Sequence, residues 1–166
     1  MSGALEQLRQ DVVQALNRGG VAAVAAMEPQ GRKRWDTPVA AVGLAGLSCR
    51  PGGFQDYLGT GKNPDTGAQE ERYGRGAELT LSLDLYAPRS GGEGACRDAL
   101  ARAAEILLAG GAGGLEVAEI AAERVEFLHQ DGLYRLPVRC RCAAWLIVRR
   151  DAGGYFTDFE VKGRLV

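Results

Sequence analysis

The stretch Gly76-Ala-Glu-Leu-Thr-Leu-Ser-Leu-Asp-Leu-Tyr-Ala87 decides the fold of this chain. Leucines alternate with polar residues along it, and successive side chains of a β-strand point to opposite faces of the sheet. The leucines are Leu79, Leu81, Leu83 and Leu85, and the polar positions are Glu78, Thr80, Ser82 and Asp84. Pro88 has no backbone N–H to donate, so the strand is expected to end there. The pattern predicts a half-buried strand whose leucine face must be covered by another element.

Two amphipathic helices are predicted to provide that cover. Residues Leu5–Leu16 place apolar side chains at three- and four-residue steps, with polar residues on the opposite side. Residues 94–109 form the second helix, and its apolar face includes Leu100, Ala103 and Leu107. We expect this second helix to pack on the leucine face of the strand.

The other segments predict a mostly antiparallel sheet. Strands are expected at 39–48, 115–120, 125–128, 133–148 and within 155–166, whereas 21–27 fits either a helical turn or a short strand. The order is helix, strand, long loop, strand, helix and then several strands. It predicts one α+β domain over residues 1–166, with two helices on one face of the sheet.

Residues 50–75 differ from the rest, because glycine, proline and Asn/Asp turn signals follow one another closely. We interpret the segment as an irregular hairpin loop that projects from the sheet. We also expect residues 53–75 to be mobile in the isolated subunit and to become ordered when a neighbour binds.

Composition excludes several classes of protein. A chain of 166 residues with 46% hydrophobic and 25% charged residues is typical of a soluble globular domain. The net charge of -1 gives no overall attraction to nucleic acid or to an anionic membrane. No apolar run approaches the roughly 20 residues of a membrane span, and the N-terminus does not resemble a signal peptide.

No motif predicts a metal, a cofactor or a catalytic centre. Four cysteines lack the spacing of a zinc site, and we expect them to be small buried hydrophobes; they are Cys49, Cys96, Cys140 and Cys142. The single histidine, His129, lies in a predicted turn. The Gly-Lys pair ending at Lys62 is not a phosphate loop, because Asp56 stands at the first glycine position and Asn63 at the hydroxyl position. We therefore expect no enzyme activity and no cofactor.

The order of elements resembles that of the tail terminator, or tail completion, proteins of long-tailed bacteriophages and related prophage tail particles. Three features carry this resemblance: the helix 5–16 ahead of a strand; the loop from Gly53-Phe-Gln-Asp-Tyr-Leu-Gly59 to Tyr73-Gly-Arg-Gly76, running into Tyr86-Ala-Pro88; and Gly94-Ala-Cys-Arg-Asp-Ala-Leu100, which opens the second helix. The resemblance covers most of the chain.

The resemblance implies a structural protein without catalytic residues. Such proteins form a hexameric ring that caps the tail tube, stops its polymerisation and offers the surface that joins the head. The expected partners are other copies of the chain, the tail tube protein, a head–tail connector protein and DNA that passes without specific binding; no membrane is involved. The implied location is the bacterial cytoplasm during assembly, and then the virion or tail-like particle.

Two groups of residues are candidates for these roles. The hypothesised contacts with neighbours or the tube are Phe54, Tyr57, Leu58, Tyr73, Arg75, Arg139 and Arg141. For Arg139 and Arg141, a plain exposed sheet face is an equally good interpretation. The polar positions Glu78, Thr80, Ser82 and Asp84 are expected to line a channel, where negative charge would repel DNA phosphates.

Other functions remain open at this point. The chain could be another neck or head-completion protein, or a small cytoplasmic α+β enzyme or ligand-binding module. A deep pocket with convergent polar groups would favour the enzyme or binding module. Large uncovered patches on a loop-decorated subunit would favour assembly.

Overall fold

The computed structural model describes residues 3–26, 35–50, 56–110, 115–151 and 156–163. Its helices are α1 (Ala4–Arg18) and α2 (Gly92–Leu108), with a short 3₁₀ turn at Arg89–Gly91. Its strands are β1 (Ala23–Ala25), β2 (Val39–Cys49), β3 (Tyr57–Lys62), β4 (Gln69–Pro88), β5 (Glu116–Ala122), β6 (Glu126–Leu128), β7 (Leu133–Arg150) and β8 (Phe156–Lys162). Among these described helices, none is long and apolar enough to cross a membrane.

All eight strands belong to one sheet. The main path is β1-β2-β4-β7-β5, while β3 also pairs with β4, and β6 and β8 pair with β7. Every pairing is antiparallel except that of β1 with β2. The predicted α+β class, with a mostly antiparallel sheet, is confirmed.

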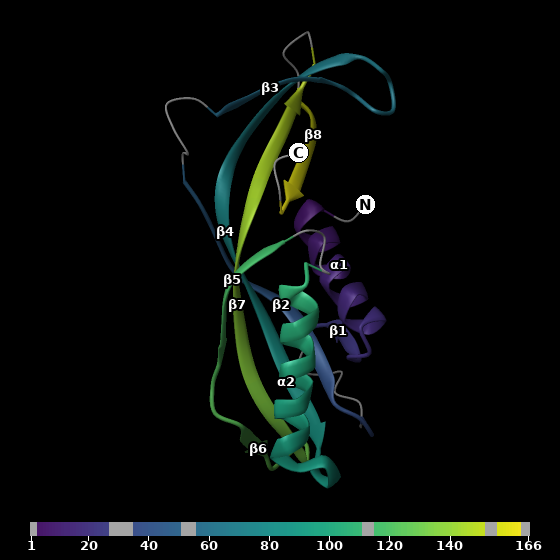
Figure 1. Ribbon diagram of the computed structural model, residues 1–166, viewed down its shortest axis with the longest axis vertical. Coiled ribbons are helices and arrows are strands. Elements are labelled where there is room, and N and C mark those ends of the chain that lie inside the picture. The colour runs from purple at the N-terminus through teal and green to yellow at the C-terminus, as the bar shows by residue number, and fades with distance from the viewer. Residues whose placement is uncertain (1–2, 27–34, 51–55, 111–114, 152–155, 164–166) are drawn as a thin grey trace.

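Two long strands run through the whole molecule. β4 has 20 residues and β7 has 18, and they pair from Pro88 with Leu133 at one end to Glu71 with Arg150 at the other. At about 3.3 Å per residue, such strands span roughly 60 Å. The molecule is therefore elongated along this pair, as Figure 1 shows.

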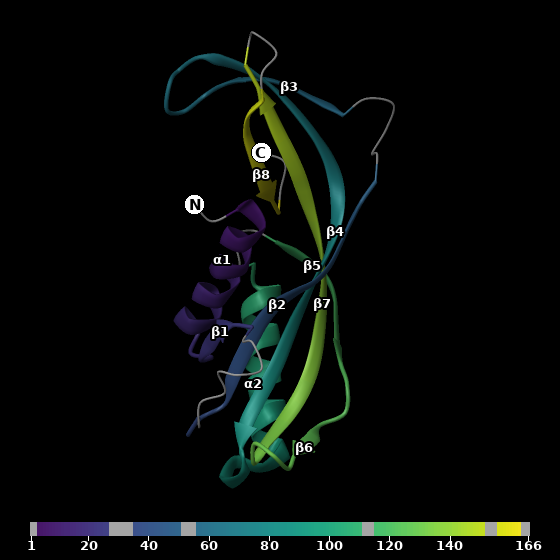
Figure 2. The same cartoon turned by 180° about the vertical axis from the view of Figure 1, so that it is seen from behind.

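The predicted cover of the leucine face is confirmed. The four leucines of β4 are at most 1% exposed, and both helices lie on their side of the sheet (Figures 1 and 2). Ala103 and Leu107 of α2 are buried in the same core, and Leu100 packs against it while partly exposed. The buried partners from α1 are Leu8, Val12 and Leu16. We call this helix-covered part of the molecule the body.

The ambiguous segment 21–27 contains a strand, not a helical turn. The side chain of Asn17, near the end of α1, accepts a hydrogen bond from the backbone N–H of Ala23 at 2.9 Å and donates one to its carbonyl at 3.0 Å. This clamp turns the chain back, and β1 then pairs in parallel with Ala40–Val42 of β2. A side-chain clamp of this kind gives no periodic signal in the sequence.

The segment interpreted as an irregular loop is a regular hairpin. β3 pairs with the first part of β4, and the turn signals gather in the short connection 63–68. There the Asn63 side-chain oxygen accepts hydrogen bonds from the N–H groups of Asp65 and Thr66, and Gly67 adopts a φ of 69°. We call this hairpin (residues 56–75), together with the parts of β7 and β8 beside it (residues 146–150 and 156–162), the arm. It projects beyond the helices, as the excursion was predicted to do (Figure 1).

Candidate functional site: a charged sheet face and a projecting arm

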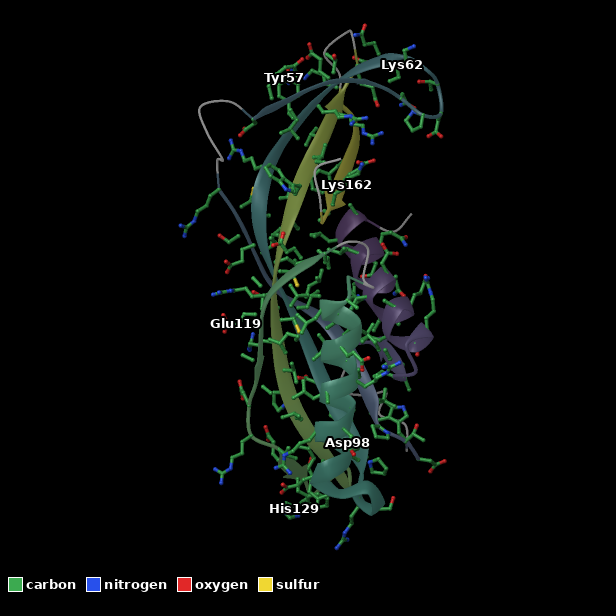
Figure 3. All side chains as sticks on the ribbon, viewed as in Figure 1. Tyr57, Lys62, Asp98, Glu119, His129 and Lys162 are labelled. Atoms are coloured by element: carbon green, nitrogen blue, oxygen red, sulfur yellow. The ribbon has the colours of Figure 1, made fainter. Side chains whose placement is uncertain are left out.

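The face of the sheet opposite the leucines carries a band of charge. The pairing of β4 with β7 sets Thr80 opposite Arg141 and Ser82 opposite Arg139. Because paired residues share a face, the predicted channel-lining residues lie on the same surface as the predicted contact arginines. The charged face is defined by Glu78, Asp84, Glu119, Arg135, Arg139 and Arg141. Figure 3 shows Glu119 pointing away from the helices.

The expected acidic wall is thereby corrected. Arg141 lies 2.9 Å from Glu119 and 3.9 Å from Glu78, and Arg135 lies 3.2 Å from Asp84. The strand β4 alone is acidic on this side, but its neighbour β7 supplies arginines at alternate positions. The face therefore carries both signs of charge and does not present the uniform negative potential that the sequence suggested.

A groove of about 420 Å³ crosses this face. It is lined by Ala45, Ser82, Asp84, Glu123, Glu126, Arg135, Pro137, Val138 and Arg139. Burial alone lowers the pKa of Arg135, but the attraction of Asp84, Tyr86 and Glu126 outweighs it, so the pKa lies above its ordinary value. Asp84 and Glu126 both face this cation. The charges of both carboxylates are therefore engaged in ion pairs with Arg135.

The predicted contact residues of the arm gather at its root. Tyr57 and Tyr73 are register partners, and their rings lie 5.4 Å apart. Arg75 forms an ion pair with Asp56 at 2.7 Å, and the Leu58 side chain lies close to Gly74. Phe54 falls outside the described residues. The structure therefore unites four of the proposed contact residues and separates them from Arg139 and Arg141.

An ion cluster inside the arm was missed from the sequence. Arg149 of β7 lies 3.5 Å from Glu70 and 2.5 Å from Glu160, and Glu70 is only 3% exposed. Lys162 approaches Glu160 at 3.2 Å, and Asn63 donates to Glu70 at 3.3 Å. Sequence reasoning had no signal for this cluster, because Glu70 lies on the same side of β4 as the exposed Glu78 and its partner Arg149 lies on a distant strand.

The cysteines divide into one exposed and three buried residues. Cys49 is exposed, which corrects the expectation that all four are buried. Burial raises the pKa of Cys140 to about 12, to which the neighbouring Cys142 also contributes, and raises the pKa of Cys142 to about 11. Both thiols are therefore protonated and unreactive near neutral pH.

The other chemical candidates lie apart. His129 is exposed in a turn as predicted, with its ring edge-on to Phe127 at 4.9 Å. Lys62 ends β3 and is followed by the arm's turn. Within the described ranges, no group of three or more His, Cys, Asp and Glu residues is arranged to hold a metal ion.

Comparison with known proteins adds no relative. No protein-family model matches the chain, and a search of curated proteins finds no significant match.

Proposed function

We propose that this protein is a structural subunit of a phage-type tail, which assembles into a ring at the end of the tail tube and terminates its growth. The observation that supports this most is the arm. A hairpin that extends well past the covered core contributes little to the body's own core, but it gives a subunit the reach to contact a neighbour or the tube (Figure 3).

The charged face has a revised role in this proposal. Since arginines and carboxylates alternate on it, the face is better matched to a protein surface of mixed charge than to a wall that repels DNA. We assign it to the contact with the tube protein or the head–tail connector. The aromatic residues at the arm's root, Tyr57 and Tyr73, are the corresponding contact between copies.

The test is the length of the tails. In the producing bacterium, loss of the gene is expected to give tails of irregular and excessive length by electron microscopy, and the intact gene supplied in trans restores them. Tails of normal length that still join heads would rule out the terminator role.

A variant lacking residues 55–72 tests the arm itself. It should fold, because none of the described residues of the hairpin belongs to the hydrophobic core clusters and joining its ends changes closure entropy little. It should nevertheless fail to restore tail length. The deletion also removes Glu70, a partner of Arg149, so Arg149→Met is combined with it to avoid a poorly paired buried cation. Thermal unfolding of the purified variant is the control for folding, and restoration of normal tails by a folded variant would show that the arm is dispensable.

A further inference from the structure

The outer edge of β2 has no strand partner among the described residues over 43–49, seven of its 11 residues. β1 pairs only with Ala40–Val42, and no other described strand pairs with the outer side of β2 beyond that point. Residues 44–49 are all exposed, including Leu44 at 38% and Leu47 at 43%. Proteins usually protect such edges with charge or proline, but residues 43–49 contain neither. An uncharged edge with two exposed leucines is suited to being covered by another chain.

The opposite edge of the sheet is formed by β5, which has β7 as its one partner among the described strands. Beside it, on the leucine side of the sheet, lies a mostly apolar groove of about 340 Å³ between β5 and α2. Its lining includes Leu100, Ala104, Leu108, Val117 and Ile120. Leu108 is 66% exposed, so this groove also presents apolar surface that the subunit itself leaves open.

The two open edges lie at the same level of the sheet. Following the register across β4 and β7, Leu44 is level with Ile120, and Leu47 is level with Val117. These four side chains share the leucine side of the sheet. The open part of β2 and the whole of β5 are also each seven residues long. One edge therefore repeats the apolar pattern of the other.

The strand directions allow the sheet to continue into a second copy. Three antiparallel pairings separate β2 from β5, so the two strands run in opposite senses. A second copy added with its leucine side on the same side would place its β2 antiparallel to β5 of the first. Each edge strand has one bulge, at Ala45 and Ala118, and the register places the bulges one residue apart. A bulge ordinarily discourages pairing at a sheet edge. When both edge strands have a bulge at nearly the same level of the sheet, however, the two strands bend at the same place and can still pair.

Charge at the end of the edges is complementary as well. The register makes Ser48 level with Glu116, which is exposed at the start of β5. Arg50, two residues beyond Ser48, is also exposed. A second copy would bring Arg50 beside Glu116.

We propose that β2 of one copy pairs with β5 of the next, with Leu44 and Leu47 entering the apolar groove between β5 and α2. This head-to-tail contact rests on the proposed function and deepens it, by naming a second surface, in addition to the arm, through which neighbouring subunits join. It uses two different patches, so each copy can bind one neighbour on each side, as a closed ring requires.

Self-association of the purified full-length protein tests the two leucines. Combined Leu44→Lys and Leu47→Lys should weaken association by at least about tenfold in sedimentation velocity, because exposed apolar area is lost and charge enters the edge. Since both side chains are exposed, the thermal midpoint should change little. Phe159→Lys is the matched control, because it makes the same change at an exposed apolar position of β8 and should leave association intact.

Cross-linking tests the pairing of the strands. Cys49 is the exposed native thiol at the end of β2, so Glu116→Cys should give a ladder of covalent oligomers with a short bismaleimide. The ladder should disappear when Cys49→Ser is added. A two-fold contact of β2 with β2 would instead cross-link Gly46→Cys in a Cys49→Ser background, giving dimers only, and would overturn the proposal.

The outcomes separate this contact from the tail function. The contact would be refuted if the Leu44→Lys and Leu47→Lys double variant still formed oligomers and if cross-linking through Cys49 gave no ladder. A ring would then have to assemble through another surface. A protein that stays monomeric at all concentrations, without cross-links, would also refute it. The tail-length experiment then decides the proposed function separately.

Discussion

The body and the arm are built on the same two strands but bury opposite faces of them. In the body, the odd-numbered leucines of β4 face the helices and are at most 1% exposed. In the arm, the even-numbered Glu70 is buried, and Arg149 of β7 is 7% exposed on the same side. The comparison teaches that a strand of 18 or 20 residues has no single inner face, because the covering layer decides burial locally.

The two interiors also differ in what they contribute to stability. Apolar burial in the body contributes about 25 cal/mol for each Å² removed from water. The arm contains the ion cluster of Glu70, Arg149 and Glu160, and the cost of desolvating buried charges largely offsets their attraction. We therefore expect the body to hold the fold together and the arm to open first.

The largest effect should come from a charge placed in the body's core. Leu83→Asp puts a carboxylate where the side chain is 1% exposed between the sheet and the helices. We expect a loss of several kcal/mol of unfolding free energy or failure to fold, measured by denaturant unfolding. Leu83→Met keeps nearly the same volume and should cost less than about 1.5 kcal/mol. An unchanged midpoint for Leu83→Asp would show that the leucine face is not the core.

Removing the cation of the arm should have the next largest effect, and it should be local. Arg149→Met leaves the buried Glu70 and the partly exposed Glu160 without their common partner, at a cost of about 3–5 kcal/mol. Hydrogen exchange should rise in the arm and stay slow in α2. Adding Glu70→Gln to Arg149→Met should recover part of the loss. Equal loss of protection in arm and body would mean that the two regions unfold as one unit.

The sequence predicted the body well because its signal is local. The alternating leucines and the periodic apolar positions of the two helices lie within single elements. The buried residues can therefore be predicted from the spacing of apolar residues along each element. The arm's interior could not be found in this way. Glu70 pairs with Arg149, 79 residues further along the chain, and a glutamate between turn signals indicates a solvated loop. The mixed charge of the open face depended in the same way on the register of β4 with β7.

A smaller effect should come from the junction between the two regions. A Cβ atom on Gly74 would lie 2.7 Å from the carbonyl oxygen of Leu146 and 2.7 Å from Leu58. Because the backbone carbonyl cannot move away easily, Gly74→Ala should cost about 1–3 kcal/mol and loosen the arm. Two residues further along β4, a Cβ on Gly76 meets nothing within 4 Å, so Gly76→Ala is the matched control. If the two variants were equally stable in denaturant unfolding, the close contact at Gly74 would not matter for the stability of the junction.

The smallest expected effect is a pH dependence that comes from two buried thiols of the body. Burial is the main cause that raises the pKa of Cys140 to about 12 and the pKa of Cys142 to about 11. The ordinary value of a cysteine thiol is 9.0. At pH 7, well below 9.0, both the folded and the unfolded protein hold these protons, so the contribution to stability is fully present. As the pH rises through 9 the unfolded chain loses its thiol protons first, and the unfolding free energy should fall by about 1 kcal/mol by pH 9 and by more beyond it.

The unfolding free energy measured from pH 7 to 10 should therefore fall less steeply in a Cys140→Ala and Cys142→Ala double variant. Val138→Ala, a buried neighbour without a titrating group, should lower stability but keep the wild-type slope. If the double variant keeps that slope too, the thiols are not the source of the alkaline loss.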